Sequence, residues 1–212
     1  MEVKKKSLIA IVVLCVLHAV GVVGLSGPLR SYFLMLTPFN LLLSTVLILS
    51  FHKQRSKDFY SMIGLIFILG YAVEIIGVNT AYPFGQYSYS DVLGFKILDT
   101  PPMIGVNWLM LVYAASSALN EWFPKLQMAA KSALGASLLL LLDVLIEPVA
   151  IDLNFWTWGQ SEIPIQNYIS WWIIAFILHL ICFKKIDQLS NKVAMVLLVL
   201  QFLFFGLLNF LI

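Results

Sequence analysis

Seven long apolar stretches constrain the fold of this chain more than any other feature. Each holds about 20 largely uncharged residues, the length that an α-helix needs to cross the apolar core of a bilayer. They run approximately from Ser7 to Leu25, Tyr32 to Phe51, Phe59 to Gly77, Pro101 to Trp122, Met128 to Ile151, Gln166 to Phe183, and Val193 to Leu211. Hydrophobic residues make up 61% of the chain and charged residues 11%. We therefore predict an all-α, polytopic integral membrane protein, with residues 1–212 as a single transmembrane helical domain.

The basic residues predict the orientation of the helices. With a cytoplasmic N-terminus, 11 of the 13 basic residues lie on the cytoplasmic side: Lys4, Lys5, Lys6, Lys53, Arg55, Lys57, Lys125, Lys131, Lys184, Lys185 and Lys192. The positive-inside rule then predicts an N-in, C-out protein, with extracytoplasmic loops at 78–100 and 152–165. We expect it in the cell (inner) membrane of a prokaryote. The net charge of +2 indicates no nucleic-acid partner.

Four polar residues lie inside the predicted spans at one depth. Glu74, Asn107, Asp143 and Glu147 all fall within about two turns of the outer ends of their spans. Asp143 and Glu147 are four residues apart and therefore share a helix face. Ionisable groups in a membrane span usually face the bundle interior or a wet cavity and serve a function. A hydrogen-bonding network that joins helices is the alternative, but three acids and an amide at one depth favour a site in the outer-leaflet half.

The two predicted outer loops are rich in aromatic residues. The segments TAYPFGQYSYSD (80–91) and NFWTWGQ (154–160) carry Tyr82, Phe84, Tyr87, Tyr89, Phe155, Trp156 and Trp158. An interfacial aromatic belt accounts for some of these rings, but the inner ends of the spans have a much sparser set. Aromatic faces stabilise cations. Acids beneath aromatic loops therefore indicate proton donation to an apolar substrate and protection of the carbocation that results.

Three segments of the chain resemble the membrane carotenoid hydratase family, which includes bisanhydrobacterioruberin hydratase and gamma-carotene hydratases. They are EIIGVNTAYPFGQYSYSDVLGFKI (74–97), TPPMIGVNWLML (100–111) and DVLIEPVAIDLNFWTW (143–158), and they span roughly half of the chain in the expected order. Two positions depart from the family pattern. Ala81 stands where the pattern has glycine, and Asn154 stands where a glycine before the aromatic residue is common.

The resemblance implies hydration of the terminal C=C of an acyclic or monocyclic carotenoid in the bilayer, giving a tertiary alcohol. This chemistry needs an acid, a pocket that tolerates a tertiary cation, and a water molecule, with no metal or other cofactor. A carboxyl group in apolar surroundings suits it because burial favours the neutral form. The expected catalytic residues are Asp143, Glu147 and Glu74, with Asp143 preferred as the proton donor. The expected substrate-binding residues are Asn107, Asn79, Tyr82, Phe84, Tyr87, Tyr89, Trp156 and Trp158.

Two other functions remain open on the sequence alone. A lycopene-type cyclase protonates the same end group but lets a neighbouring double bond capture the cation. A small proton-coupled transporter also uses intramembrane acids, although the chain has no obvious inverted repeat. A retinal protein would need a lysine in the last span, and Val193 to Leu211 has none. No pattern in the sequence favours one oligomeric state or one particular carotenoid.

Overall fold

The computed structural model describes residues 2–160, 162–186 and 189–212, and over this part of the chain it contains seven long helices. They are α1 (Glu2–Ser26), α2 (Arg30–Ser50), α3 (Lys57–Thr80), α4 (Met103–Trp122), α5 (Met128–Asp152), α6 (Ile165–Lys185) and α7 (Lys192–Leu211). All seven are long and apolar enough to cross a membrane. The seven predicted helices are therefore confirmed, with boundaries that differ by a few residues.

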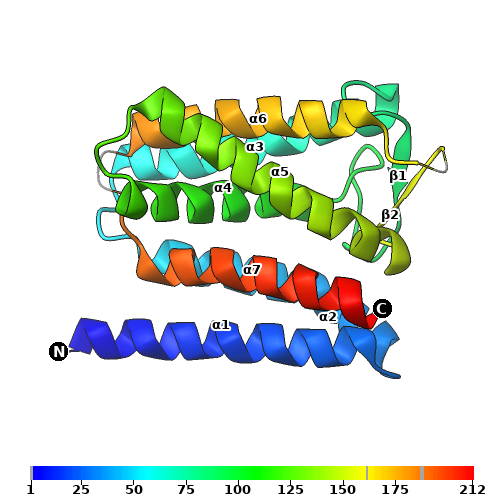
Figure 1. The fold of residues 1–212 in the computed structure, drawn as a ribbon, viewed down its shortest axis with the longest axis horizontal. Coiled ribbons are helices and arrows are strands. Elements are labelled where there is room, and N and C mark those ends of the chain that lie inside the picture. The colour runs from blue at the N-terminus through cyan, green and yellow to red at the C-terminus, as the bar shows by residue number, and fades with distance from the viewer. Residues whose placement is uncertain (1, 161, 187–188) are drawn as a thin grey trace.

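Helix α4 is the centre of the bundle. It packs against α2, α3, α5, α6 and α7, whereas α1 packs only against α2 and α7 among the described elements, at one side of the molecule (Figure 1). Every residue of α4 from Ile104 to Leu119 is buried except Asn107. Because the rest of this stretch is fully packed, Asn107 marks the place where the central helix borders open space.

Glycines bring the helices close together on either side of α4. A Cβ atom added at Gly70 of α3 would lie 2.6 Å from the Cβ of Trp108. A Cβ atom at Gly135 of α5 would lie 2.4 Å from the ring of His179 in α6. Small residues at such crossings let helix backbones approach closely inside a membrane. Gly70 and Glu74 are one turn apart on α3. The close contact of Trp108 with Gly70 therefore holds Trp108 near Glu74.

The two aromatic loops pair as a short antiparallel ribbon, an element that the sequence analysis did not predict. Strand β1 (Tyr87–Tyr89) lies beside β2 (Trp156–Trp158), with Tyr87 opposite Trp158 and Tyr89 opposite Trp156. Side chains alternate between the two faces of a strand. The four aromatic rings therefore lie on one face of the ribbon. On the other face the hydroxyl oxygens of Ser88 and Thr157 lie 3.2 Å apart.

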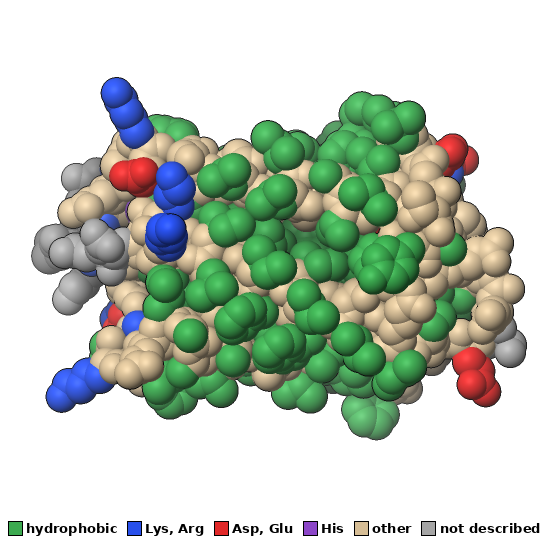
Figure 2. All heavy atoms as spheres, turned by 90° about the horizontal axis from the view of Figure 1, so that it is seen from above, with side chains coloured by type: hydrophobic (Ala, Val, Ile, Leu, Met, Phe, Trp, Pro, Cys, Tyr) green, Lys and Arg blue, Asp and Glu red, His purple; other side chains and the backbone are tan. Residues whose placement is uncertain are grey.

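The surface of the bundle is divided along its long axis. Figure 2 shows hydrophobic side chains across the middle of the molecule and most of the Lys and Arg side chains in view at the end where the N-terminus lies. That end holds the α2–α3 connection (51–56) and the α4–α5 connection (123–127). The β1–β2 ribbon lies at the opposite end (Figure 1). The length of the helices thus separates the ribbon from most of the basic residues, while Lys96 lies beside the ribbon and donates to the backbone oxygen of Tyr89.

The two departures from the family pattern lie where the backbone has a positive φ. Ala81 ends α3 at φ 60°, and Asn154 follows α5 at φ 55°. Asparagine tolerates this left-handed conformation, whereas the Cβ of other L-residues crowds the carbonyl oxygen. The structure thus explains why glycine suits both positions.

We predict that Ala81→Gly raises the thermal midpoint of the detergent-solubilised protein. The gain is up to about 1 kcal/mol, because relief of the left-handed strain exceeds the added freedom of the unfolded chain. Asn154→Gly is the matched control and should give no gain, since asparagine already fits the conformation. A lower midpoint for Ala81→Gly would contradict this account of α3 termination.

Candidate functional site

Three carboxyl groups meet in the interior of the bundle near the ribbon. Glu74 of α3 and Asp143 and Glu147 of α5 are 2%, 1% and 2% exposed. The amide nitrogen Nδ2 of Asn167, in the first turn of α6, lies 3.3 Å from both Asp143 Oδ2 and Glu147 Oε1. The fold therefore joins the two acids of α5 through a side chain of α6.

Glu74 accepts three hydrogen bonds. The phenol groups of Tyr87 and Tyr89 donate to Oε2 at 2.7 and 2.8 Å. The indole nitrogen of Trp108 donates to Oε1 at 3.0 Å. All three partners donate, which is what a buried carboxylate requires in the absence of water.

Glu147 also accepts three hydrogen bonds. The indole nitrogens of Trp156 and Trp158 both donate to Oε2 at 3.0 Å, and Asn167 donates to Oε1. The four aromatic residues on the inner face of the ribbon thus serve the two glutamates, β1 serving Glu74 and β2 serving Glu147. Because side chains alternate along a strand, the patterns Tyr-Ser-Tyr and Trp-Thr-Trp place all four donors on the inner face of the ribbon.

Asp143 accepts fewer hydrogen bonds than the two glutamates. Its Oδ2 accepts from Asn167, while its Oδ1 is buried and has no hydrogen-bond partner among the residues that the structure describes. A carboxylate offers about four acceptor positions. Donors fill three on Glu74, three on Glu147 and one on Asp143. A proton placed on Asp143 Oδ1 would displace no donor.

A small cavity lies against the two glutamates. The volume that the centre of a water molecule can occupy in it is about 20 Å³. About one water fits into a space of this size. We call it the acid cavity; its lining is Glu74, Phe84, Tyr87, Tyr89, Ile104, Asn107, Ile146, Glu147, Trp156, Trp158, Asn167 and Trp171. Asp143 does not belong to the lining, but it accepts a hydrogen bond from Asn167, which does.

A second space, the apolar cavity, adjoins the acid cavity. The volume that the centre of a water molecule can occupy in it is about 70 Å³. It shares Ile104, Asn107, Ile146 and Trp156 with the acid cavity. Its remaining lining is Thr37, Leu41, Leu93, Met103, Ala150, Phe155 and Phe205. Leu93 and Met103 also line an open groove of about 890 Å³ between α2 and residues 90–103. The open groove, the apolar cavity and the acid cavity therefore follow one another, in this order, from the outer surface of α2 to the acids.

The structure brings most of the predicted site residues together. Glu74, Glu147, Asn107, Phe84, Tyr87, Tyr89, Trp156 and Trp158 line the acid cavity, and Asp143 lies directly behind it. Asn79 and Tyr82 lie elsewhere. The Asn79 amide donates to the backbone oxygens of Ile75 and Leu98, and the Tyr82 side chain is 71% exposed.

Two residues that hold the acids were not singled out from the sequence. Asn167 bridges Asp143 and Glu147, and Trp108 donates to Glu74. Asn167 carried a usable signal, because it is an amide in the outer turn of a predicted span, at the depth of the acids. Trp108 carried none, since an apolar span gives no hint of where an indole nitrogen points. Within the described residues, no group of three His, Cys, Asp and Glu side chains is placed to hold a metal ion.

Comparison with known proteins identifies the family. Residues 34–212 match the family described as "Carotenoid biosynthesis protein". The chain belongs to this carotenoid biosynthesis family. It is also similar to bisanhydrobacterioruberin hydratase of Haloarcula japonica, with 27% identity over 116 residues. The match covers 49% of the chain and 38% of that protein, so the chain spans well under half the length of this relative. No solved structure matches the chain.

In this carotenoid biosynthesis family member, the ribbon tyrosines predict a pH dependence of stability. Burial raises the pKa of Tyr87 and Tyr89 above the usual value, and the charge of Glu74 raises it further. An unfolded chain releases phenol protons above about pH 10, while the folded state retains them. Their stabilising contribution is therefore complete below about pH 10 and is lost as pH rises further. The thermal midpoint in detergent should fall over this range, and less steeply for the double variant Tyr87→Phe/Tyr89→Phe. Equal slopes would contradict the prediction.

Proposed function

We propose that the protein hydrates the terminal C=C of an acyclic or monocyclic carotenoid end group, giving a tertiary alcohol. The observation that carries the proposal is a cluster of three buried carboxyl groups, two of which line a cavity with room for one water, next to an apolar cavity with aromatic walls. Membership of the carotenoid biosynthesis family supports a carotenoid substrate. The name of the Haloarcula japonica relative supports hydration.

The acid cluster supplies the proton. Asp143 stores it on Oδ1, and Glu147, which lines the acid cavity, passes it toward the wall shared with the apolar cavity. The two carboxyl groups share Asn167 as a donor and make no direct hydrogen bond among the described contacts, so the transfer between them requires the Asp143 side chain to rotate toward Glu147. The proton adds to the less substituted alkene carbon, the π electrons form the new C–H bond, and a tertiary cation and a carboxylate result. A water oxygen then bonds to the cation, and its released proton returns to the carboxylate. The net change is addition of one water, with no oxidation or reduction.

The aromatic walls protect the cation between these two steps. Phe155, Trp156 and Phe205 line the apolar cavity, and the face of an aromatic ring attracts a positive charge. Trp156 acts on both sides of the wall, because its ring lines both cavities while its indole nitrogen donates to Glu147. Charge that develops in the apolar cavity therefore lies close to the carboxylate that the proton has left.

The open groove is the route by which the polyene reaches the apolar cavity. Its α2 wall carries Met35 and Phe39, which are exposed on the apolar side surface of the bundle. A carotenoid lying in the bilayer can therefore insert one end between α2 and residues 90–103. The end then passes Leu93 and Met103 and remains in an apolar environment throughout.

The charge distribution supports a location for the reaction. Most of the Lys and Arg side chains in view in Figure 2 lie at the end of the bundle opposite the ribbon, whose place Figure 1 shows. With that end in the cytoplasm, as the positive-inside rule favours, the acid cluster lies in the outer-leaflet half of the cell membrane.

The main test is conversion of an acyclic carotenoid in cells that accumulate lycopene. The wild-type protein should yield pigment heavier by the mass of one water. Asp143→Asn and Glu147→Gln should each lower the yield by about 100-fold or more, since general acid–base groups contribute at least this much. Asp152→Asn is the matched control on the same helix, because Asp152 is half exposed and pairs with Arg30 away from the cluster. It should keep the wild-type yield.

Three outcomes would overturn the proposal. Wild-type rates for both Asp143→Asn and Glu147→Gln, at equal membrane levels, would remove the acids from the mechanism. A product of unchanged mass with a ring at the chain end would identify a cyclase. Unaltered pigment in every strain would favour transport over catalysis.

A separate prediction concerns the route of the polyene. Met103→Trp should lower conversion at limiting carotenoid, because a larger ring narrows the passage from the groove to the apolar cavity. Phe95→Trp is the control, since Phe95 lines only the open groove and is largely exposed. The measurement is the rate of hydrated product in membranes at several lycopene contents. Equal effects of the two variants, or none from Met103→Trp, would place the entrance elsewhere.

A further inference from the structure

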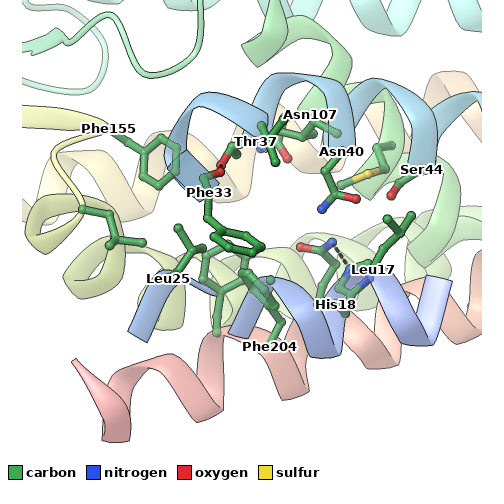
Figure 3. Close-up of a pocket in the computed structure, with 17 residues that line it drawn as sticks. Leu17, His18, Leu25, Phe33, Thr37, Asn40, Ser44, Asn107, Phe155 and Phe204 are labelled. Carbon is green, nitrogen blue, oxygen red and sulfur yellow. Dashed lines mark hydrogen bonds between the residues drawn. The ribbon is translucent and has the colours of Figure 1, made fainter. Parts of the chain in front are cut away.

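A third cavity, which the reaction above does not use, lies between α1, α2 and α7 (Figure 3). We call it the α1 cavity. It has about 160 Å³ of room for the centres of water molecules. Its walls are mainly apolar, but polar side chains enter it from all three helices: His18 from α1, Asn40 and Ser44 from α2, and Gln201 from α7.

Two of these polar groups have no hydrogen-bond partner in the part of the chain that the structure describes. Oγ of Ser44, a residue only 2% exposed, and Oδ1 of Asn40 are buried without a hydrogen-bond partner among the described residues. In Figure 3 the Asn40 amide points into the cavity toward His18. Buried polar groups in proteins are almost always hydrogen-bonded. The α1 cavity therefore requires an occupant that can donate to and accept from its walls.

The histidine adds a further acceptor at the same place. Nδ1 of His18 lies 2.8 Å from the backbone oxygen of Leu14, so this nitrogen carries the proton and donates. Nε2 is then the acceptor, and the Gln201 amide nitrogen donates to it at 3.0 Å. This bond orients the Gln201 amide and leaves its oxygen as an acceptor. A neutral His18 also brings no charge that an ion would have to balance.

Water fits these requirements, and an apolar chain does not. A cavity of about 150 Å³ lined only by apolar side chains stays dry, whereas a water needs about 10–15 Å³ of such room and two to four polar partners. The α1 cavity offers enough volume and enough polar partners for several waters. A lipid tail or a polyene in the same space would leave Asn40 and Ser44 unpaired in an apolar environment, which is unfavourable.

The α1 cavity also connects to the reaction site. It shares Thr37, Leu41, Asn107, Phe155 and Phe205 with the apolar cavity. Asn107 lines the α1, apolar and acid cavities alike, and its amide makes no hydrogen bond with any described residue. The border between the acid cavity and the apolar cavity also includes Asn107, but its other residues, Ile104, Ile146 and Trp156, do not line the α1 cavity. An end group in the apolar cavity thus has the acids on one side and the α1 cavity on another.

We propose that the α1 cavity is a water chamber that supplies the water consumed in hydration. This inference rests on the proposed function. A water leaves the chamber past Asn107, its oxygen bonds to the tertiary cation, and its surplus proton returns to the acid cluster. Asn40, Ser44 and Gln201 hold the waters that replace it.

The first test measures water in the chamber without any activity assay. Hydroxyl radicals generated from bound water by X-ray pulses oxidise side chains beside that water. Met110 lines the chamber and is 2% exposed, while Met62 is 0% exposed and does not line it. In the detergent-solubilised protein, Met110 should be oxidised and Met62 should not. Asn40→Leu combined with Ser44→Ala should abolish the oxidation of Met110. A Met110 as protected as Met62 in the wild-type protein overturns the proposal.

The second test measures the fate of the cation. When water is scarce, the cation loses a proton or closes a ring, and the product keeps the mass of the substrate. Ser44→Ala and Asn40→Leu should therefore lower the share of hydrated product among all converted carotenoid. Ser44→Thr, which keeps the hydroxyl, should restore it. Thr45→Val is the control, because the Thr45 hydroxyl donates to the Leu41 backbone oxygen and does not line the chamber.

The two tests separate this inference from the proposed function. A wild-type protein that hydrates carotenoid, together with variants that keep the wild-type share of hydrated product, overturns the water chamber alone. A wild-type protein that forms no hydrated product overturns the proposed function, and the supply role falls with it. Oxidation of Met110 then still decides whether the α1 cavity holds water.

Discussion

The organisation of this protein follows from the need to supply hydrogen bonds to three carboxyl groups in the interior of an apolar bundle. An unpaired carboxylate in such a place would cost more free energy than a small bundle can spare. Here every donor is a neutral N–H or O–H group, from two tyrosines, three tryptophans and one asparagine. No lysine or arginine is among them. The acids are therefore stabilised without ion pairs, which would hold them permanently ionised.

This choice of donors explains the elements around the site. Aromatic side chains carry their polar atom at the far end of a rigid ring, so they reach a buried carboxylate while their faces pack as hydrophobic groups. Strands β1 and β2 lie outside the helical spans and turn one face inward, so that four such donors arrive together. Gly70 lets α4 approach α3 closely enough for Trp108 to supply the fifth. Asp143 is left with a single donor, so a proton on its other oxygen would displace none.

The helices, and the fact that the three acids lie close together, could be predicted from the sequence because both leave one-dimensional signals. A span of about 20 apolar residues has few other stable conformations in a membrane, and a carboxylate within such a span is conspicuous. The ribbon could not be predicted in the same way. Its strands have three residues each and pair across 69 residues of chain, so neither strand has a local pattern long enough to recognise. Tyr82 was expected at the site with its neighbours, but it precedes the inward-facing positions of β1 and points outward.

Cavities are the least predictable feature, because they depend on how side chains from distant helices fail to fill a space. Asn107 illustrates this. The sequence marks it as an amide at the depth of the acids, but only the packing of α1, α2, α5 and α7 makes it the common wall of three cavities. Its position in the sequence suggests an orienting role beside the acids, and the structure shows that Asn107 also borders the α1 cavity.

The same arrangement bears on why one acid cluster would hydrate a carotenoid when a similar cluster could cyclise it. Both reactions begin with protonation of the same alkene carbon, so the acids do not decide between them. The choice falls to whichever nucleophile reaches the tertiary cation first, a water or the next double bond of the polyene. In this protein the polar groups that can keep water near the apolar cavity come from α1, α2 and α7, on a different side from the acids of α3 and α5. Product identity would then be set by helices that contribute no catalytic carboxyl group, and it could change through Asn40, Ser44 or Gln201 while the acid cluster stayed the same.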